Sequence, residues 1–349
     1  MQVNKALIWN AACLFVTLAI GELYCGFKQT DATAAYPHLL HVTNGLGWAA
    51  KPGVFRAVKK YGFGLETVYD VTYSISHSGF RITPGGADGP TVFFLGDSIT
   101  FGEGVNDNQT LPYEFSALSG MRAVNFGVDG YGPHHMLRMF ELNIPRTVDQ
   151  STPRFVVYTA FSDHIRRAAG GAQWDQKGPL YEVAGDGVQY VGSFKDKSSK
   201  GVSKRAGSSL WQEMIEQSRI YGAIAPTPAY LPDSSDINVR ENDRKRFLFI
   251  VEKTSLIVKE QYHCPFVVLL WDTRSRKSVT IEDMSWVEAR LNEFGIPVLR
   301  LSTVVTDPNF RTWIIENDNH PDGRAYHYAA RSLLNFLRRT TPEVLEKLS

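Results

Sequence analysis

From about residue 90 onward, short runs of apolar residues alternate with longer segments of helical periodicity. Five runs have the length and composition of buried strands, namely residues 91–95, 123–126, 155–160, 266–271 and 296–301. Apolar residues at helical spacing are clearest in four segments, residues 134–142, 241–261, 281–294 and about 322–339. Strands that alternate with helices predict a parallel sheet covered by helices on both faces. We therefore expect an α/β fold, a three-layer α/β/α sandwich with a five-stranded parallel sheet, over residues 90–340.

The beginning of the chain has a different pattern, with one apolar stretch over residues 6–24 that only Asn10 and Glu22 interrupt. A stretch of about 20 apolar residues is long enough to span a bilayer. Residues 1–27 are therefore predicted to be a transmembrane anchor, and Lys5 ahead of the stretch favours a body outside the cytoplasm. The alternative is a cleaved signal segment, because Ala19 and Gly21 are small residues at a suitable place. Either interpretation predicts that the rest of the chain is periplasmic or extracellular.

Two further regions flank or interrupt the alternating pattern. Residues 28–89 are punctuated by Gly and Pro and contain one strictly alternating run, residues 67–75, which predicts a half-exposed strand in a small β-rich extension that ends in a linker. Residues 168–236 are predicted to be an insertion in the main domain. Within it, β-type sequences on both sides of Gly185 and Gly187 predict a hairpin.

Composition narrows the possible functions. The chain has 349 residues, 43% of them hydrophobic, and a net charge of +1, so it is globular and nothing in its charge favours binding to nucleic acid. Its three cysteines, Cys13, Cys25 and Cys264, are too few and too scattered for a disulfide framework or a zinc site. We expect no metal or organic cofactor, and the sequence does not indicate an oligomeric state.

The candidate chemistry begins where the first buried strand ends, in Gly96, Asp97 and Ser98. A buried parallel strand delivers the residue after it to the carboxyl edge of the sheet, where open α/β folds place their sites. A serine hydroxyl becomes a nucleophile when an imidazole takes its proton and a carboxylate orients that imidazole. His320 and Asp318 have the right chemical types, and a separation of two residues suits this task if both lie on a loop.

An oxyanion formed by such a serine needs hydrogen-bond donors. The backbone N–H of Ser98 is one candidate. A second is the N–H of Gly130, which lies in the glycine-rich segment that follows the second strand. Glycines at such a place let the backbone approach a ligand closely.

Together these segments resemble the SGNH or GDSL hydrolase family of serine esterases and acyltransferases. Gly96-Asp97-Ser98-Ile99 matches its first block, residues 125–132 its second, and Asp318-Asn319-His320-Pro321 its last. The resemblance implies that Ser98 is the nucleophile, His320 the base, Asp318 the orienting acid and Gly130 an oxyanion donor. It also implies five parallel strands in the order 2-1-3-4-5. Thr100 interrupts the Gly-x-Ser-x-Gly pattern, which argues against an α/β-hydrolase.

The chain departs from the family pattern at two places. The third block usually contains an Asn whose amide serves the oxyanion hole, but Ser162 stands there, followed by Asp163 and His164. We interpret Ser162 as a weaker donor and His164 as a possible replacement, with Asp97 and Asp163 in supporting positions. The second departure is Asn317, at the position where many relatives carry the acid, so the orienting role passes to Asp318.

Three other features are given structural interpretations. The pair His134 and His135 has no carboxylate or cysteine at ligand spacing, so it is interpreted as structural or substrate-lining. Arg166 and Arg167 are interpreted as a solvated helix start, and Trp211 as packing within the insertion.

The sequence as a whole predicts a serine esterase that hydrolyses an acyl ester of a small molecule or carbohydrate, such as an O-acetyl group on a cell-envelope carbohydrate. Two alternatives stay open. One is an O-acyltransferase acting on a surface polysaccharide, which needs the same residues. The other is a catalytically impaired carbohydrate-binding protein, which the serine at position 162 motivates.

Overall fold

The structure, a computed structural model, describes residues 5–27, 30–32, 40–43, 45–62, 66–85, 89–196, 237–273 and 281–342. The part of the predicted insertion beyond residue 196, with Trp211, lies outside the described residues, as does the middle of the predicted linker.

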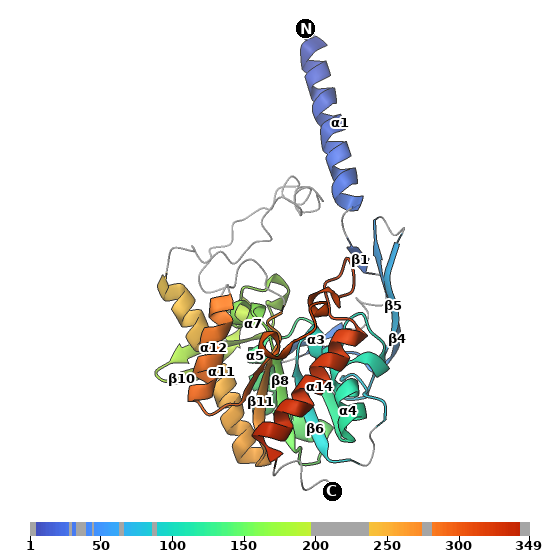
Figure 1. The fold of residues 1–349 in the computed structure, drawn as a ribbon. Helices are drawn as coiled ribbons and strands as arrows, with labels where there is room; N and C mark the ends of the chain where they lie inside the picture. Colours follow the sequence, from blue (N-terminus) through green and yellow to red (C-terminus); the bar gives the residue numbers. More distant parts are fainter. Residues whose placement is uncertain are drawn as a thin grey trace.

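A five-stranded parallel sheet forms the centre of the molecule, with helices on both sides (Figure 1). Its strands are β6 (Thr91–Gly96), β7 (Arg122–Gly127), β8 (Phe155–Ala160), β11 (Phe266–Leu270) and β12 (Val298–Arg300). They lie in the order β12-β11-β8-β6-β7, which is the predicted order 2-1-3-4-5 read from the other edge. The predicted fold class is therefore confirmed.

Only the fifth strand differs clearly from its predicted length, because β12 has three residues. At its beginning, the N–H of Ile296 donates a hydrogen bond to the carbonyl of Leu291 in the preceding helix, so it is not available to pair with a neighbouring strand. At its end, Leu301 already opens the short helix α13 (Leu301–Val304). The apolar residues between 296 and 301 are therefore buried in three different places: in the loop after α12, in β12 and at the start of α13.

Alternate side chains of the central strands enter two separate cores. In β6, Phe93 and Leu95 lie in one core, whereas Val92 and Phe94 lie in the other, and all four are fully buried. The first core is covered by α5 (Pro133–Glu141), α11 (Ile237–Tyr262) and α12 (Ile281–Glu293). The second is covered by α4 (Leu111–Ser119) and α14 (Gly323–Thr340). Burial of each such side chain contributes roughly 1.5–3 kcal/mol, so these layers fix the sheet in place.

Antiparallel strands precede the main sheet. β4 (Gly53–Tyr61) pairs with β5 (Glu66–Ile75) and with β1 (Thr30–Ala32), and a separate ribbon joins β2 (Leu40–Thr43) to β3 (Gly47–Ala50). The predicted alternation is confirmed in β5, where Tyr69, Val71, Tyr73 and Ile75 are buried and the intervening residues are not. These side chains share a core with Phe101, so the N-terminal sheet packs against the segment that follows β6.

The predicted hairpin of the insertion is also confirmed, as β9 (Pro179–Ala184) and β10 (Gly187–Ser193). It follows α7 (Asp163–Ala168) and the single turn η2 (Gln173–Asp175). Tyr181 and Val188 of the hairpin pack against Leu137 of α5 and Ile250 of α11. The hairpin is thus anchored to the helices of the first core.

The N-terminal apolar stretch forms the helix α1 (Lys5–Phe27), which extends away from the sheet in Figure 1. Within the ranges given above, no helix is both long enough and apolar enough to cross a bilayer. The transmembrane span predicted for residues 1–27, which Asn10 and Glu22 interrupt, is therefore not found.

Candidate active site

Ser98 is the first residue of the four-residue helix α3 (Ser98–Phe101), which begins directly after β6. Asp97 caps this helix, because its Oδ1 accepts the N–H of Ile99 at 3.0 Å. The turn is tight: a Cβ at Gly96 would lie 2.2 Å from Oγ1 of Thr100. Glycine is therefore required where the strand delivers Ser98 to the carboxyl edge of the sheet.

The structure brings His320 to Ser98 although 222 positions separate them in sequence. Nε2 of His320 lies 2.8 Å from Oγ of Ser98. On the other side of the ring, Nδ1 is bonded to Oδ1 of Asp318, which also accepts the backbone N–H of His320 at 3.0 Å. Asn317 and Asn319 have positive φ values of 58° and 74°, so the chain turns sharply on both sides of Asp318. That loop conformation lets an acid only two residues from His320 reach its ring.

The second oxygen of Asp318 is bound by a residue that sequence reasoning did not identify. Nζ of Lys59, in β4, donates to Oδ2 of Asp318 at 2.6 Å. Burial alone would raise the pKa of Asp318, but the hydrogen bonds from His320 and Lys59 outweigh it and hold that pKa far below its usual range. Asp318 is therefore ionised at neutral pH and stabilises a positive charge on His320.

Gly130 lies at the same edge of the sheet as Ser98. It follows β7, whose last residue, Gly127, pairs with Gly96 of β6. Its φ is +77°, and a Cβ there would lie 2.9 Å from Nε1 of Trp174, which donates to the Gly130 carbonyl at 3.2 Å. A side chain at this position would therefore strain the backbone and collide with the indole of Trp174.

Ser162 follows β8, the other neighbour of β6, and is 3% exposed. It stands before α7 without capping it, and its Oγ has no hydrogen-bond partner among the described residues. His164 is turned elsewhere: its Nδ1 lies 2.7 Å from the hydroxyl of Tyr158, and its Nε2 lies 3.5 Å from Oδ2 of Asp97. The proposed replacement of the missing amide by His164 is therefore wrong, because both ring nitrogens face other groups.

Asp97 and Asp163 are joined by Arg167, the second residue that sequence reasoning missed. Nη1 of Arg167 donates to Asp97 at 3.0 Å, and its Nε donates to Asp163 at 2.9 Å. Burial disfavours the charge on Arg167, but the two carboxylates outweigh this effect and raise its pKa. The interpretation of residues 166–167 as a solvated helix start is therefore wrong for Arg167, which is buried and bound to Asp97, the residue before Ser98.

Glu103 is the third missed residue. It follows α3 between two glycines of positive φ, Gly102 and Gly104, and is 7% exposed. Its Oε2 lies 3.3 Å from Nε2 of His320, the same nitrogen that faces Ser98. The signal in the sequence was an acid between two glycines, five residues after Ser98. No comparable signal marked Lys59, since its contact depends on how the N-terminal sheet packs.

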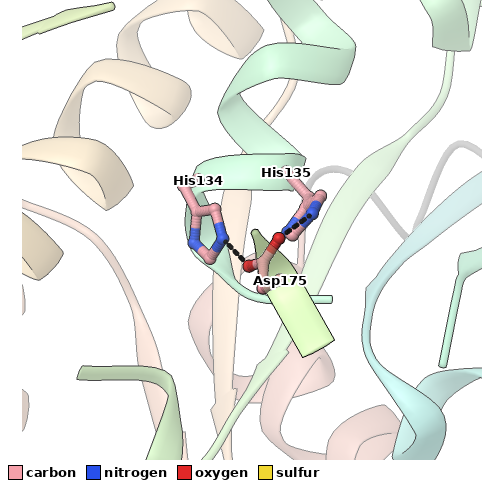
Figure 2. Close-up of side chains that lie close together, drawn as sticks. All are labelled: His134, His135 and Asp175. Carbon is pink, nitrogen blue, oxygen red and sulfur yellow. Dashed lines mark hydrogen bonds and ion pairs between the residues drawn. The ribbon is translucent and has the colours of Figure 1, made fainter. Parts of the chain in front are cut away.

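Among the described residues, two groups of side chains have ligand atoms close enough to share a cation: Glu103 with Asp318 and His320, and His134 with His135 and Asp175. Figure 2 shows the second group, in which Asp175 lies 2.6 Å from Nε2 of His134 and 3.4 Å from Nε2 of His135. Nδ1 of His135 accepts the N–H of Gly132 at 3.2 Å, so Nε2 of that ring carries the proton. Burial lowers the pKa of His134 to about 4, so it is neutral at pH 7 and its Nε2–H donates a hydrogen bond to Asp175. Both rings thus present N–H groups to the carboxylate of Asp175.

No family model matches the chain, and no curated protein matches it. Among solved structures, a protein of the lipolytic G-D-S-L family from Desulfitobacterium hafniense DCB-2 is 16% identical, with a TM-score of 0.38, and the match covers 71% of this chain and 99% of that one. A family two carbohydrate esterase from Clostridium thermocellum, in complex with cellohexaose, is 12% identical with a TM-score of 0.41, over 76% of this chain and 68% of that one. An acetyl xylan esterase from Butyrivibrio proteoclasticus is 10% identical with a TM-score of 0.40, over 72% of this chain and 64% of that one.

Proposed function

We propose that this protein is a serine esterase that cleaves an acyl ester through an acyl-enzyme on Ser98. The observation that carries the proposal is the 2.8 Å distance between Oγ of Ser98 and Nε2 of His320, whose Nδ1 is bonded to Asp318. This arrangement activates a serine, because the imidazole can take the proton of the hydroxyl and the ionised carboxylate stabilises the imidazolium that forms.

The reaction follows from these contacts. Oγ of Ser98 attacks the ester carbonyl while its proton passes to Nε2 of His320, and Asp318 stabilises the resulting imidazolium. The tetrahedral oxyanion is bound by the N–H groups of Ser98 and Gly130. Collapse of this intermediate breaks the ester bond, and His320 returns the proton to the departing alcohol oxygen. A water molecule, activated by the same imidazole, then releases the acid.

Ser162 is the proposed third donor of the oxyanion hole. Its hydroxyl is buried at the carboxyl edge of the sheet and makes no hydrogen bond within the described ranges, so it is free to turn toward a developing negative charge. A serine hydroxyl reaches less far than the usual amide. Because one oxyanion donor contributes about 2.7–4 kcal/mol to lowering the barrier, we expect slower turnover than an amide would support.

A carbohydrate ester is the substrate class we propose. Trp174 is 52% exposed and lies beside Gly130, where an exposed indole offers an apolar face to a sugar ring. A sugar ring there would lie next to Gly130, whose N–H is a proposed oxyanion donor. The location of the protein outside the cytoplasm stays a prediction.

Hydrolysis of p-nitrophenyl acetate by the full chain tests the proposed reaction. Wild-type protein should release nitrophenol and should be labelled by a fluorophosphonate, and Ser98→Ala should lose both properties. Absence of turnover together with absence of labelling would overturn the esterase and favour the catalytically impaired carbohydrate-binding protein. Turnover that survives Ser98→Ala would refute the assignment of the nucleophile.

The same assay separates hydrolysis from transfer. An acetylated xylo-oligosaccharide should release acetate, and replacing Trp174 with Ala should raise KM for it while leaving KM for p-nitrophenyl acetate unchanged. If an added oligosaccharide instead receives the acyl group at the expense of acetate release, the protein is an O-acyltransferase that uses the same residues.

A further inference from the structure

His320 is in contact with two carboxylates, one on each side of its ring. Asp318 is bonded to Nδ1, as the esterase mechanism requires. Glu103 lies 3.3 Å from Nε2, the nitrogen that has to accept the proton of Ser98. Its side chain is 9% exposed, so water competes little for its charge. The esterase mechanism gives no role to a carboxylate at this position.

The surroundings of Glu103 make its charge costly. Burial is the largest effect and raises the pKa of Glu103, Asp129 and Asp318 also raise it, and His320 and Lys59 lower it. The net result is a pKa of about 7. The hydroxyl of Tyr69 donates to Oε1 of Glu103 over a long 3.4 Å. The titratable groups that face Glu103 are Lys59 of β4, Tyr69 and Tyr73 of β5, Asp129 after β7, and Asp318 and His320 before α14. Glu103 therefore gains or loses its proton in the pH range in which a histidine acts as a base.

We propose that Glu103 is a positioning residue that shares a proton with Nε2 of His320 and thereby sets the pH above which His320 can act as the base. The inference rests on the proposed esterase function and deepens it.

The number of protons on the pair decides whether Nε2 is available. When the pair holds one proton, either His320 is charged and donates to Glu103, or Glu103 is neutral and donates to Nε2. Ser98 finds no free base in either arrangement, and the two sites titrate as a coupled pair. When the pair loses this proton, Nε2 is free to accept the proton of Ser98.

The ionised Glu103 then has a second effect. Once the Oγ–H bond of Ser98 breaks and an Nε2–H bond forms, the carboxylate lies next to the new imidazolium and stabilises it until the proton passes to the leaving alcohol. Opposite charges within about 4–6 Å shift a pKa by 1–3 units in favour of the charged form. In the pH profile of the reaction, Glu103 therefore lowers activity on the acid limb and raises it on the plateau above that limb.

The pH profile of Glu103→Gln tests this role, because Gln keeps the size of the side chain and removes its charge. For p-nitrophenyl acetate hydrolysis by the full chain, the acid limb of kcat/KM should shift to lower pH by about one unit, and the plateau should fall. Relative to its own plateau, the variant is then about tenfold more active than wild type below the limb. Glu114→Gln is the matched control, since Glu114 lies 2.7 Å from His327 in a second Glu–His contact on the surface. The control should leave the limb in place.

An NMR titration gives a readout that does not need turnover. In wild-type protein, the ring resonances of His320, assigned by their loss in His320→Gln, should show two inflections, and Glu103→Gln should leave one at lower pH. A single inflection in wild type that Glu103→Gln does not move would overturn the shared proton. Absence of Ser98-dependent turnover would instead overturn the esterase proposal, and the titration would still decide the role of Glu103.

Discussion

Nζ of Lys59 lies 2.6 Å from Oδ2 of Asp318, so a strand of the N-terminal sheet binds the carboxylate that faces the candidate base. Asp318 thereby uses one oxygen for His320 and the other for Lys59. The two contacts fix the rotation of the carboxylate and keep it ionised although its side chain is fully buried. The N-terminal sheet is therefore part of the candidate active site.

Replacing Lys59 with Met should lower kcat about tenfold, which corresponds to about 1.4 kcal/mol in the barrier. The reason is that Asp318 loses a charged partner, so its pKa rises and it stabilises the imidazolium of His320 less well. KM should change little, because Lys59 contacts the acid and its side chain is only 17% exposed. Steady-state kinetics with p-nitrophenyl acetate measure both values. Lys60→Met, one residue along the same strand, is the control, and equal kcat values for the two variants would contradict the role of Lys59.

The hydroxyl of Ser162 can be tested by removing it alone. Ser162→Ala should lower kcat by about 10²-fold with KM unchanged, as expected for a donor that acts only on the transition state. Thr159→Val is a matched control, because Oγ1 of Thr159 is also buried and also lacks a hydrogen-bond partner in the described part of the chain. If the two variants lose activity equally, the loss comes from altered packing and Ser162 is not an oxyanion donor.

The parts of the fold and site that could be predicted are those that depend on local sequence. Buried strands flanked by helical segments predicted the parallel sheet, and the resemblance to SGNH hydrolases implied its strand order. The segments after β6 and before α14 pointed to Ser98, Asp318 and His320 as candidates. The register of the sheet then explains why residues after β6, β7 and β8 share one edge, since parallel strands end on the same side.

The remaining residues depend on contacts between elements that are distant in sequence. Lys59 lies close to Asp318 because the N-terminal sheet packs against Phe101. Asp175 contacts His134 because the turn η2, which follows α7, places it there. Arg167 was interpreted as a solvent-exposed charge, because its buried partner Asp97 lies 70 positions earlier in the sequence. Charge pairs across such separations leave no periodic pattern in the sequence.

Arg167 should be important for stability as well as for the position of Ser98. Arg167→Met leaves Asp97 and Asp163 without their shared cation in a buried site, so we expect a loss of about 3–5 kcal/mol in the free energy of unfolding. Urea denaturation followed by circular dichroism measures this loss. Arg166→Met is the control, because Arg166 also binds Asp163 but its side chain is 19% exposed, and it should cost less. A loss below about 1 kcal/mol for Arg167→Met would show that the two acids find other partners.

The contact of His134 and Asp175 in Figure 2 should make the folded state sensitive to acid. The pKa of His134 falls from its ordinary value of 6.5 to about 4 on folding, mainly through burial. The unfolded chain therefore binds a proton that the folded chain resists, and the free energy of unfolding decreases as pH falls from about 6.5 to about 4. Asp175 behaves differently: its pKa is lowered to about 2, so its contribution is intact over this range and is lost only at lower pH.

Replacing His134 with Gln isolates this effect, because the amide can still donate to Asp175 but does not titrate. Between pH 7 and pH 4.5, wild-type protein should lose up to about 3 kcal/mol more stability than His134→Gln, and urea denaturation at several pH values measures the difference. His327→Gln serves as the control, since the side chain of His327 is 49% exposed and its removal should leave the slope against pH unchanged. If wild type and His134→Gln lose stability in parallel, His134 is protonated in the folded state at these pH values, and Asp175 then holds an imidazolium.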